Sequence, residues 1–463
     1  MFRNIFPSVS KVLKASVRHC WANCTPVDLP SNTQLCILPN GVRVATEQTN
    51  SSLASISLYI EAGPRFETAC NNGITHFIEH MAYKGFNSMT KCQLQESLLL
   101  MGAKLGAHTT REIQIFSAKC LVENAGDIIH ILSNVITDLA LLEEEIEAER
   151  YNICLEMVDA DNDPKQVVFD YLHQTAFQGT PLSQRVIGPT RNIQRFDRHF
   201  TATFLSQHYQ PYKLALVSSG CLDHSQMVDF ALARLGHMVS HSAYESDVGP
   251  CRFTGSQVIY RDDSMPFAHV AIAVEAPGYN SPEYLTLLAA SYVVGSWNKG
   301  QGGGINNASP LAQAAATGNL CESFESFYIA YRDIGLWGCY FACDRMKLED
   351  MIYNIQNTWM NLCISTQFFD AKRGSRLAHL KIAKAVTGSI NSCHDLGIQT
   401  MYRCGRKSIQ DIAYDLSTIN QQNVKETVEK YIYDRCPAVV AVGPTENLPD
   451  YTRIRAGMYW LRL

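Results

Sequence analysis

Alternating hydrophobic and polar positions predict β-strands at several places along the chain. "CILPNGVRVATEQ" (residues 36–48) alternates on both sides of an Asn-Gly pair, which is typical of a hairpin with a tight turn. "ASISLYIEAGPRFE" (residues 54–67) predicts a strand that ends at a Gly-Pro pair. The stretches at residues 208–220 and 432–444 each run from an aromatic residue through a proline into an apolar strand and a glycine.

These strand patterns occur twice, about half a chain apart. "AHVAIAVEAPGYNSPE" (residues 268–283) has the same shape as residues 54–67, and Glu275 takes the place of Glu61. The stretch at 432–444 repeats the pattern of 208–220 at a similar offset. Because both offsets nearly agree, the sequence favours a duplication that gives two similar halves.

Helical stretches lie between the strands, for example at residues 125–142 and 348–365. Strands and helices mix without strict alternation. We therefore predict an α+β fold of two similar domains, each a mostly antiparallel sheet flanked by helices. The polar stretch at residues 241–256 is the expected linker, which places the two domains at residues 32–240 and 257–463.

Residues 1–31 have the composition of a mitochondrial transit peptide. Arg3, Lys11, Lys14 and Arg18 interleave with apolar residues and serines, and no acidic residue stands among them. The two lysines interrupt the apolar run that a secretory signal needs. The alternative is an ordinary basic arm. The pattern predicts a presequence and a mitochondrial location.

Length and composition exclude several classes of protein. The chain has 463 residues, of which 46% are hydrophobic and 18% charged, so it can bury two globular cores. A net charge of -5 gives no general attraction to nucleic acid, and we expect no such partner. No run approaches the ~18 apolar residues of a membrane span. The 16 cysteines are scattered without a Cys-x-x-Cys pair, which favours buried free thiols over a zinc ribbon or a disulfide scaffold.

The strongest chemical signal is "HFIEH", which begins at His76 and ends at His80. Residues one helical turn apart lie on one face, about 5–6 Å from each other, and two imidazoles at that spacing can hold one Zn²⁺. Glu79 stands beside the second histidine, where a carboxylate can move the proton of an activated water. The order His-x-x-Glu-His is that of the inverzincins. A chance grouping is the alternative, and a zinc site requires a third protein ligand.

A second predicted helix supplies candidates for that ligand. Glu149 and Glu156 share the inward stripe of this helix with Ile146 and Ile153. A carboxylate at an inward position needs a partner, such as a metal or a hydrogen-bonded histidine. We interpret Glu156 as the ligand and Glu149 as its support, although periodicity does not order the two roles. Two glutamates at the edge of a partly exposed helix are the alternative.

At these residues the sequence resembles the pitrilysin–insulinase-type metallopeptidases. The likeness is greatest to their mitochondrial branch of processing-peptidase subunits and core subunits of respiratory complex III, insect-type sequences above all. It covers the chain from about residue 32 onward. The motifs that carry it are "NNGITHFIEHMAYKGF" (71–86), "IEAERYNICLE" (146–156), "GSWNKGQGGGINNAS" (295–309), "DIGLWGCYFACD" (333–344) and "NLPDYTRIRAGMYWLRL" (447–463).

The resemblance implies that His76, His80 and Glu156 hold one Zn²⁺ per chain. It makes Glu79 the general base and Glu149 a hydrogen-bond partner of a ligand, and it leaves the second half without a metal site. The implied protein is a matrix endopeptidase that removes presequence peptides from imported proteins together with an α-type subunit. The alternative is a structural core subunit that contacts the membrane subunits of complex III from the matrix side.

The predicted substrate cleft departs from the family pattern. Gly106 stands where the family has an asparagine that binds the substrate backbone, and His108 replaces a tyrosine. Gln166 replaces one of two acids that would face a presequence arginine, and Asp170 is the acid that remains. Because a charged pair with arginine is stronger than a neutral hydrogen bond, these departures imply weaker binding of basic substrates. They are typical of a diverged paralog with reduced activity.

Overall fold

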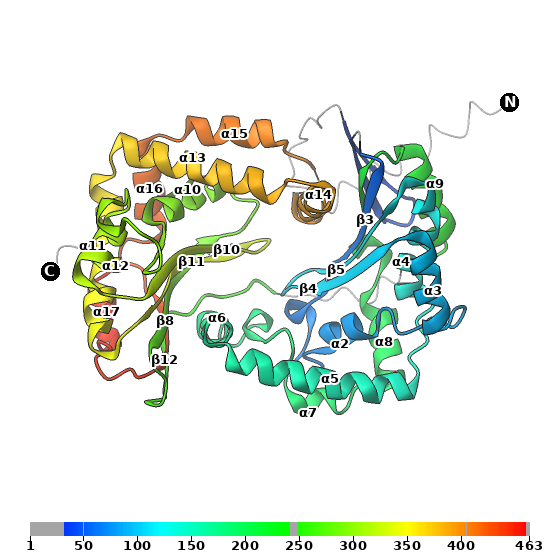
Figure 1. Cartoon of the computed structure of the whole chain (residues 1–463), viewed down its shortest axis with the longest axis horizontal. Coiled ribbons are helices and arrows are strands. Elements are labelled where there is room, and N and C mark those ends of the chain that lie inside the picture. Colours follow the sequence, from blue (N-terminus) through cyan, green and yellow to red (C-terminus); the bar gives the residue numbers. More distant parts are fainter. Residues whose placement is uncertain (1–31, 50, 241–248, 404, 460–463) are drawn as a thin grey trace.

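The computed structural model describes residues 32–49, 51–240, 249–403 and 405–459. The predicted transit peptide and residues 241–248 of the predicted linker lie outside these ranges. Two lobes stand side by side, each built on a sheet with helices packed against it (Figure 1). This arrangement is the predicted α+β fold of two similar halves.

The first sheet has the strand order β1-β2-β6-β3-β5-β4. Its strands are β1 (Thr33–Ile37), β2 (Arg43–Gln48), β3 (Leu53–Ile60), β4 (Lys104–Thr109), β5 (Gln114–Leu121) and β6 (Leu214–Gly220). β1 and β2 pair in antiparallel register, as the hairpin pattern predicts. The β2–β6 pair is parallel, and the other pairs are antiparallel.

The second sheet has the order β7-β12-β8-β11-β10-β9. Its strands are β7 (Gln257–Arg261), β8 (Ala268–Pro277), β9 (Ser296–Asn298), β10 (Ser323–Ala330), β11 (Ile334–Cys343) and β12 (Ala438–Gly443). The run β7-β12-β8-β11-β10 matches β2-β6-β3-β5-β4 of the first sheet, and its single parallel pair, β7–β12, occupies the same place. The repeat predicted from the sequence is therefore present in the topology.

Helices cover the faces of both sheets. In the first half they are α2 (Ile74–Met81), α3 (Lys91–Met101), α4 (Ala125–Thr137), α5 (Glu143–Asn162), α6 (Pro164–Ala176), α7 (Thr190–Ile193), α8 (Arg198–His208) and α9 (His224–Leu235). In the second half they are α10 (Tyr284–Val294), α11 (Pro310–Gly318), α12 (Leu348–Ser365), α13 (Phe368–Ala385), α14 (Ser389–Arg403), α15 (Ile409–Thr418), α16 (Gln421–Tyr431) and α17 (Tyr451–Ala456). Among the described residues, no helix combines the length and apolarity needed to cross a membrane.

Two of the predicted helices can be compared directly with these bounds. The prediction at residues 348–365 coincides with α12. The prediction at residues 125–142 extends too far, because α4 ends at Thr137. Leu139 instead pairs with Phe86 in an isolated antiparallel bridge, so the backbone leaves the helix before the apolar pattern ends.

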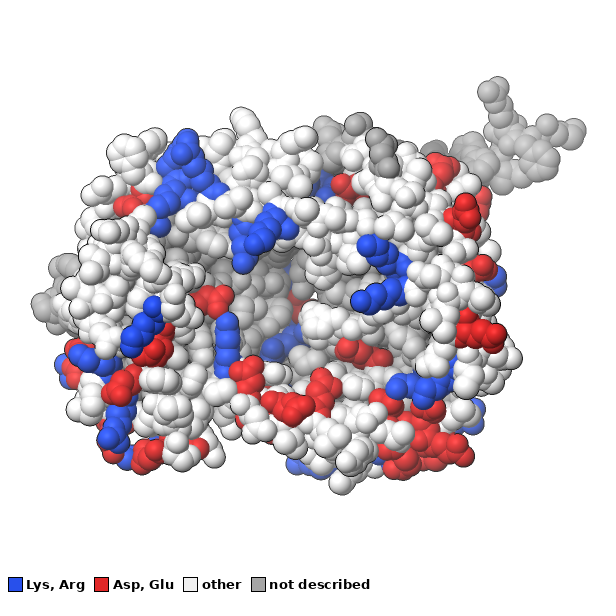
Figure 2. Space-filling view, viewed as in Figure 1, with Lys and Arg blue, Asp and Glu red and all other residues white. Residues whose placement is uncertain are grey.

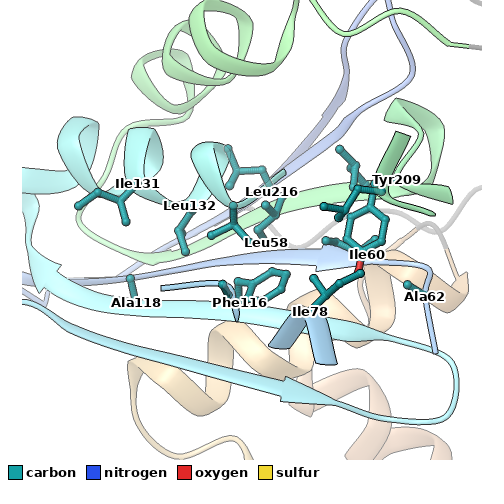
Figure 3. Packing of buried hydrophobic residues seen from close by; sticks show 14 of the residues in the cluster. Leu58, Ile60, Ala62, Ile78, Phe116, Ala118, Ile131, Leu132, Tyr209 and Leu216 are labelled. Atoms are coloured by element: carbon teal, nitrogen blue, oxygen red, sulfur yellow. The ribbon is translucent and has the colours of Figure 1, made fainter. Parts of the chain in front are cut away.

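Each half has a core between its sheet and its own helices. In the first half, Leu58 and Phe116 of the sheet pack in one buried cluster with Leu132 of α4 (Figure 3). In the second half, Trp337 of β11 packs against Trp359 of α12, with ring centroids 5.1 Å apart. Both cores are apolar and close-packed, so each sheet is a rigid platform for the segments at its edge.

The two halves also exchange a helix. Val168 and Leu172 of α6, in the first half of the sequence, pack in a buried cluster with Val440 of the second sheet. In return, Leu396 of α14 packs in a buried cluster with Tyr59 of the first sheet. Figure 1 shows α6 and α14 at the junction of the lobes. The predicted linker divides the sequence into halves, whereas the packing crosses that division twice.

Candidate metal centre

The short helix α2, which carries the histidine motif, is fixed at its N-terminal end. Gly73 precedes the helix with a φ of 97°, and a Cβ at this position would lie 2.6 Å from the carbonyl oxygen of Ile187. Only glycine fits this backbone and this close approach. The buried carboxylate of Glu67 accepts hydrogen bonds from the backbone N–H groups of Gly73 at 2.8 Å and Thr75 at 3.0 Å. These bonds satisfy free N–H groups of the first turn and set where the helix begins.

The structure brings His76, His80 and Glu156 together. Nε2 of His76 lies 3.2 Å from Oε2 of Glu156, and Nε2 of His80 lies 3.0 Å from the same oxygen. One ligand atom from each of the three side chains lies within 4.8 Å of the other two, so the three could hold one metal ion. Ligands of a tetrahedral zinc, at about 2.0–2.1 Å from the metal, stand roughly 3.3 Å apart. Two imidazoles and one carboxylate at this spacing fit a single Zn²⁺.

The exposure of the three side chains differs. The His76 side chain is 8% exposed, whereas that of Glu156 is 45% exposed. The candidate site is therefore closed on the side of α2 and open to solvent on the side of α5. A catalytic zinc site keeps one coordination position accessible to water or substrate. The solvent-exposed side of the candidate site, beside Glu156, can supply that position.

Glu149 contacts the His80 ring on the nitrogen opposite the one that faces Glu156. Its Oε2 lies 3.0 Å from Nδ1 of His80, and its Oε1 accepts hydrogen bonds from Nζ of Lys84 and from Nδ2 of Asn152. Burial raises the pKa of Glu149, but the bonds with Lys84 and His80 outweigh it and bring the pKa below its ordinary value. A charged carboxylate on Nδ1 orients the His80 ring so that Nε2 faces Glu156.

Glu79 lies beside the candidate metal ligands. Its Oε2 is 3.5 Å from Nδ1 of His76. Burial raises the pKa of Glu79, but hydrogen bonds with His76 and Thr109 outweigh it, and the pKa lies below its ordinary value. Burial lowers the pKa of His76, while Glu156 and Glu79 raise it to about 9. Hydrogen bonds with His76 and His80 hold the pKa of Glu156 well below its ordinary value. Both acids are therefore charged at neutral pH.

Gly106 and His108, which the sequence predicts to line a substrate cleft, lie on β4, the edge strand of the first sheet, and α2 packs against this strand. His108 is exposed, and its protonated form lowers the pKa of Glu79. A Cβ added at Gly106 would meet only the Ser117 hydroxyl, at 3.1 Å. Tyr83 donates a hydrogen bond to the Gly106 carbonyl at 3.2 Å, so the strand is tied to the segment that follows α2.

Gln166 and Asp170 both lie on α6, but only Gln166 is exposed. Asp170 accepts hydrogen bonds from Arg111 at 2.7 Å and from Arg185 at 3.0 Å. The sequence predicts Asp170 as an acid available to a substrate arginine, whereas two arginines of the same chain already bind it. No pattern in the sequence joins these three positions.

Other contacts at the centre are absent from the sequence prediction. Lys84, which binds Glu149, follows His80 by four residues, and that spacing is a visible signal. Thr109, whose hydroxyl lowers the pKa of Glu79, is the last residue of β4 and carries no comparable signal.

On the face shown in Figure 2, a hollow between the lobes has both acidic and basic residues at its rim.

Two family models match the chain, and the second match begins in the first half and continues past the predicted linker into the second half. Residues 43–190 match the family model "Insulinase (Peptidase family M16)", and residues 198–371 match "Peptidase M16 inactive domain". The five residues at the candidate centre, His76, Glu79, His80, Glu149 and Glu156, all lie in the first matched segment.

Relatives of two kinds are similar to nearly the whole chain. It is 40% identical to cytochrome b-c1 complex subunit 1, mitochondrial, of Homo sapiens, over 93% of this chain and 90% of that protein. It is 38% identical to mitochondrial-processing peptidase subunit beta of Homo sapiens, over 93% of this chain and 88% of that protein. A chain of complex III2 from Candida albicans, Inz-5 bound, has a similar structure, with a TM-score of 0.82, 25% identity, and coverage of 92% of this chain and 99% of that chain.

Proposed function

The chain belongs to peptidase family M16, the insulinase family, and from this premise we propose that it is a zinc metalloendopeptidase of the processing-peptidase β type. Its substrates are the basic presequences of proteins imported into mitochondria, and it works in the matrix with an α-type subunit. The observation that carries the proposal is the convergence of two imidazoles and a carboxylate, His76, His80 and Glu156, beside the charged Glu79.

Each residue has a distinct task in the proposed reaction. His76, His80 and Glu156 would hold Zn²⁺, which would supply Lewis-acid chemistry for the scissile carbonyl and the attacking water. Glu79 accepts the proton of the attacking water and passes it to the leaving amine, because its carboxylate is charged at neutral pH. Glu149 keeps the His80 ring in the orientation that presents Nε2.

The substrate and the partner rest on the relatives. A processing-peptidase subunit named beta, 38% identical over 93% of this chain, supports a role beside an α-type subunit in mitochondria. Gln166, exposed on α6, and the edge strand with Gly106 and His108 are the proposed contacts for the peptide. Asp170 can contact the peptide only after it gives up its hydrogen bond with Arg111 or with Arg185.

The second candidate function is that of a structural core subunit in respiratory complex III, with reduced or no peptidase activity. A 40% identical relative is a cytochrome b-c1 complex subunit, and the similar solved chain belongs to a complex III assembly. The pairing of Asp170 with Arg111 and Arg185 favours this role, because it removes the remaining acid from the recognition of a basic peptide.

The deciding experiment uses the tagged chain, purified under native conditions from mitochondria with the subunits that accompany it. Zinc content and cleavage of a synthetic basic presequence peptide are measured for the wild type and for Glu79→Gln. We expect one zinc per chain in both proteins and cleavage only in the wild type, because the amide of the variant cannot accept a proton. Glu144→Gln, which changes an exposed acid on α5, is the matched control and keeps full activity.

The outcomes separate the two functions. Protein without zinc, or cleavage that survives Glu79→Gln, rejects the peptidase. Stoichiometric co-purification with cytochrome b, together with no cleavage by the wild type, establishes the structural role instead.

A further inference from the structure

A line of buried hydrogen bonds runs to Thr109, which lies beside Glu79. The hydroxyl of Tyr209 donates to Oε1 of Gln114, and Nε2 of Gln114 donates to Oγ1 of Thr109 at 3.1 Å. The Thr109 hydroxyl lies beside Glu79 and lowers the pKa of its carboxylate. Gln114, Tyr209 and Thr109 are 0%, 2% and 5% exposed, so water does not compete for these bonds.

The direction of these bonds is fixed by chemistry. The second hydrogen of the Gln114 amide goes to the backbone carbonyl of Thr75 at 2.6 Å. A carbonyl oxygen only accepts, so the amide nitrogen must face Thr75 and its oxygen must face Tyr209. Burial and the nearby acids Glu67 and Glu79 raise the pKa of Tyr209, so its hydroxyl keeps the proton that it donates.

The same bonds tie together elements that converge on the candidate centre. Thr109 ends β4 and stands opposite Gln114, the first residue of β5, in the antiparallel register. Thr75 belongs to α2, one turn before Glu79. Tyr209 directly follows α8 and lies in the same buried cluster as Ile60 (Figure 3). A displacement of α2 relative to the sheet edge would therefore break bonds that have no solvent replacement.

We infer that Thr109, Gln114 and Tyr209 are positioning residues, which hold the Glu79 carboxylate at the place where it meets the attacking water. The inference rests on the proposed peptidase function and adds residues to its site. Since Gln114 supplies a hydrogen to Thr109, the Thr109 hydroxyl has its own hydrogen left for Glu79. A carboxylate held in this way loses rotational freedom before the substrate arrives, which lowers the barrier to proton transfer.

The test compares Thr109→Val, which removes only the hydroxyl, with Thr109→Ser, which keeps it. We expect Thr109→Val to lower kcat for the presequence peptide by about tenfold to a hundredfold with KM and zinc content nearly unchanged. Thr109→Ser stays close to the wild type. Tyr209→Phe, at the far end of the line, lowers kcat in the same direction by a smaller factor.

Thr400→Val is the matched control, because Thr400 is fully buried and its hydroxyl donates to the Leu396 carbonyl at 2.7 Å, away from Glu79. It reports the effect of losing a buried hydroxyl on folding alone. A Thr109→Val enzyme with kcat within about twofold of the Thr400→Val enzyme overturns the inference.

A crystal structure of each variant gives a readout that does not depend on turnover. The inference requires one Glu79 conformer bonded to residue 109 in the wild type and in Thr109→Ser, and a displaced or divided one in Thr109→Val. The same Glu79 conformer in all three structures overturns it. If the wild type cleaves nothing but Glu79 still moves in Thr109→Val, the proposed function fails and the positioning role stands.

Discussion

Nδ1 of His80 lies 3.0 Å from Oε2 of Glu149, a carboxylate whose side chain is only 4% exposed. The opposite ring nitrogen, Nε2, faces Glu156. Glu149 is therefore placed to act on the proposed metal ion through the His80 ring. A carboxylate in this place fixes the ring and raises the basicity of the ligating nitrogen.

Glu149→Gln is expected to weaken zinc binding by roughly tenfold to a hundredfold, because an amide orients the His80 ring without a charge. Affinity is measured by competition with a chromogenic chelator at fixed pH. Glu144→Gln, an exposed acid on the same helix, leaves the affinity unchanged. Equal affinities in both variants would show that Glu149 serves only the fold.

Arg185 is expected to limit recognition of basic peptides, because it occupies Asp170 together with Arg111. Arg185→Gln frees one carboxylate oxygen and should raise kcat/KM several-fold for a peptide with arginine near the cleaved bond. Arg185→Lys keeps a cation on Asp170 and is the control. The same change for a peptide with citrulline in place of arginine would contradict the role of charge.

The residues at the candidate centre could be proposed from the sequence because their spacing is local. His76 and His80 are one helical turn apart, and Glu149 and Glu156 are two turns apart on one helix. Local periodicity fixes which side chains share a face, and the structure places both faces together. It could not show that Asp170 is bound, because Arg111 and Arg185 reach it from outside α6.

The fold, like the candidate centre, was predictable from the sequence only where it depends on local patterns. Alternation indicated β1 and β2, and the repeated strand pattern indicated two similar halves, but the strand order that the two sheets share came only from the structure. The exchange of α6 and α14 was not predictable, since an apolar helix face does not specify which sheet it covers. That choice depends on contacts between residues more than a hundred positions apart, such as Tyr59 and Cys393.

Stability should fall as the pH drops below about 6.5, and His173 is one cause. Its ring is buried between two bonds, with Nδ1 2.6 Å from the Phe169 carbonyl and the Tyr331 hydroxyl 2.7 Å from Nε2. Burial lowers the pKa of His173 well below its ordinary value. The unfolded chain therefore binds a proton below about pH 6.5 that the folded chain refuses, and folding loses free energy there.

Thermal unfolding of the wild type is expected to show a decreasing Tm from pH 7 to pH 5, with a shallower slope in His173→Gln. The slope does not vanish, because burial and Lys213 lower the pKa of His208 to about 4, so His208 acts over the same range. Identical slopes for the two proteins would mean that His173 stays unprotonated in the unfolded chain or is protonated in the folded one.

Because of the helix exchange, neither half should fold alone. Residues 32–240 expressed separately would expose the face of α6 that carries Val168 and Leu172, and would lack the cover that Leu396 of α14 gives to the first sheet. Exposed apolar faces of this kind promote aggregation. We expect each half to be insoluble, and a co-expressed pair split within the predicted linker to form a soluble 1:1 complex by size-exclusion chromatography. Cooperative thermal unfolding of an isolated half would refute the dependence.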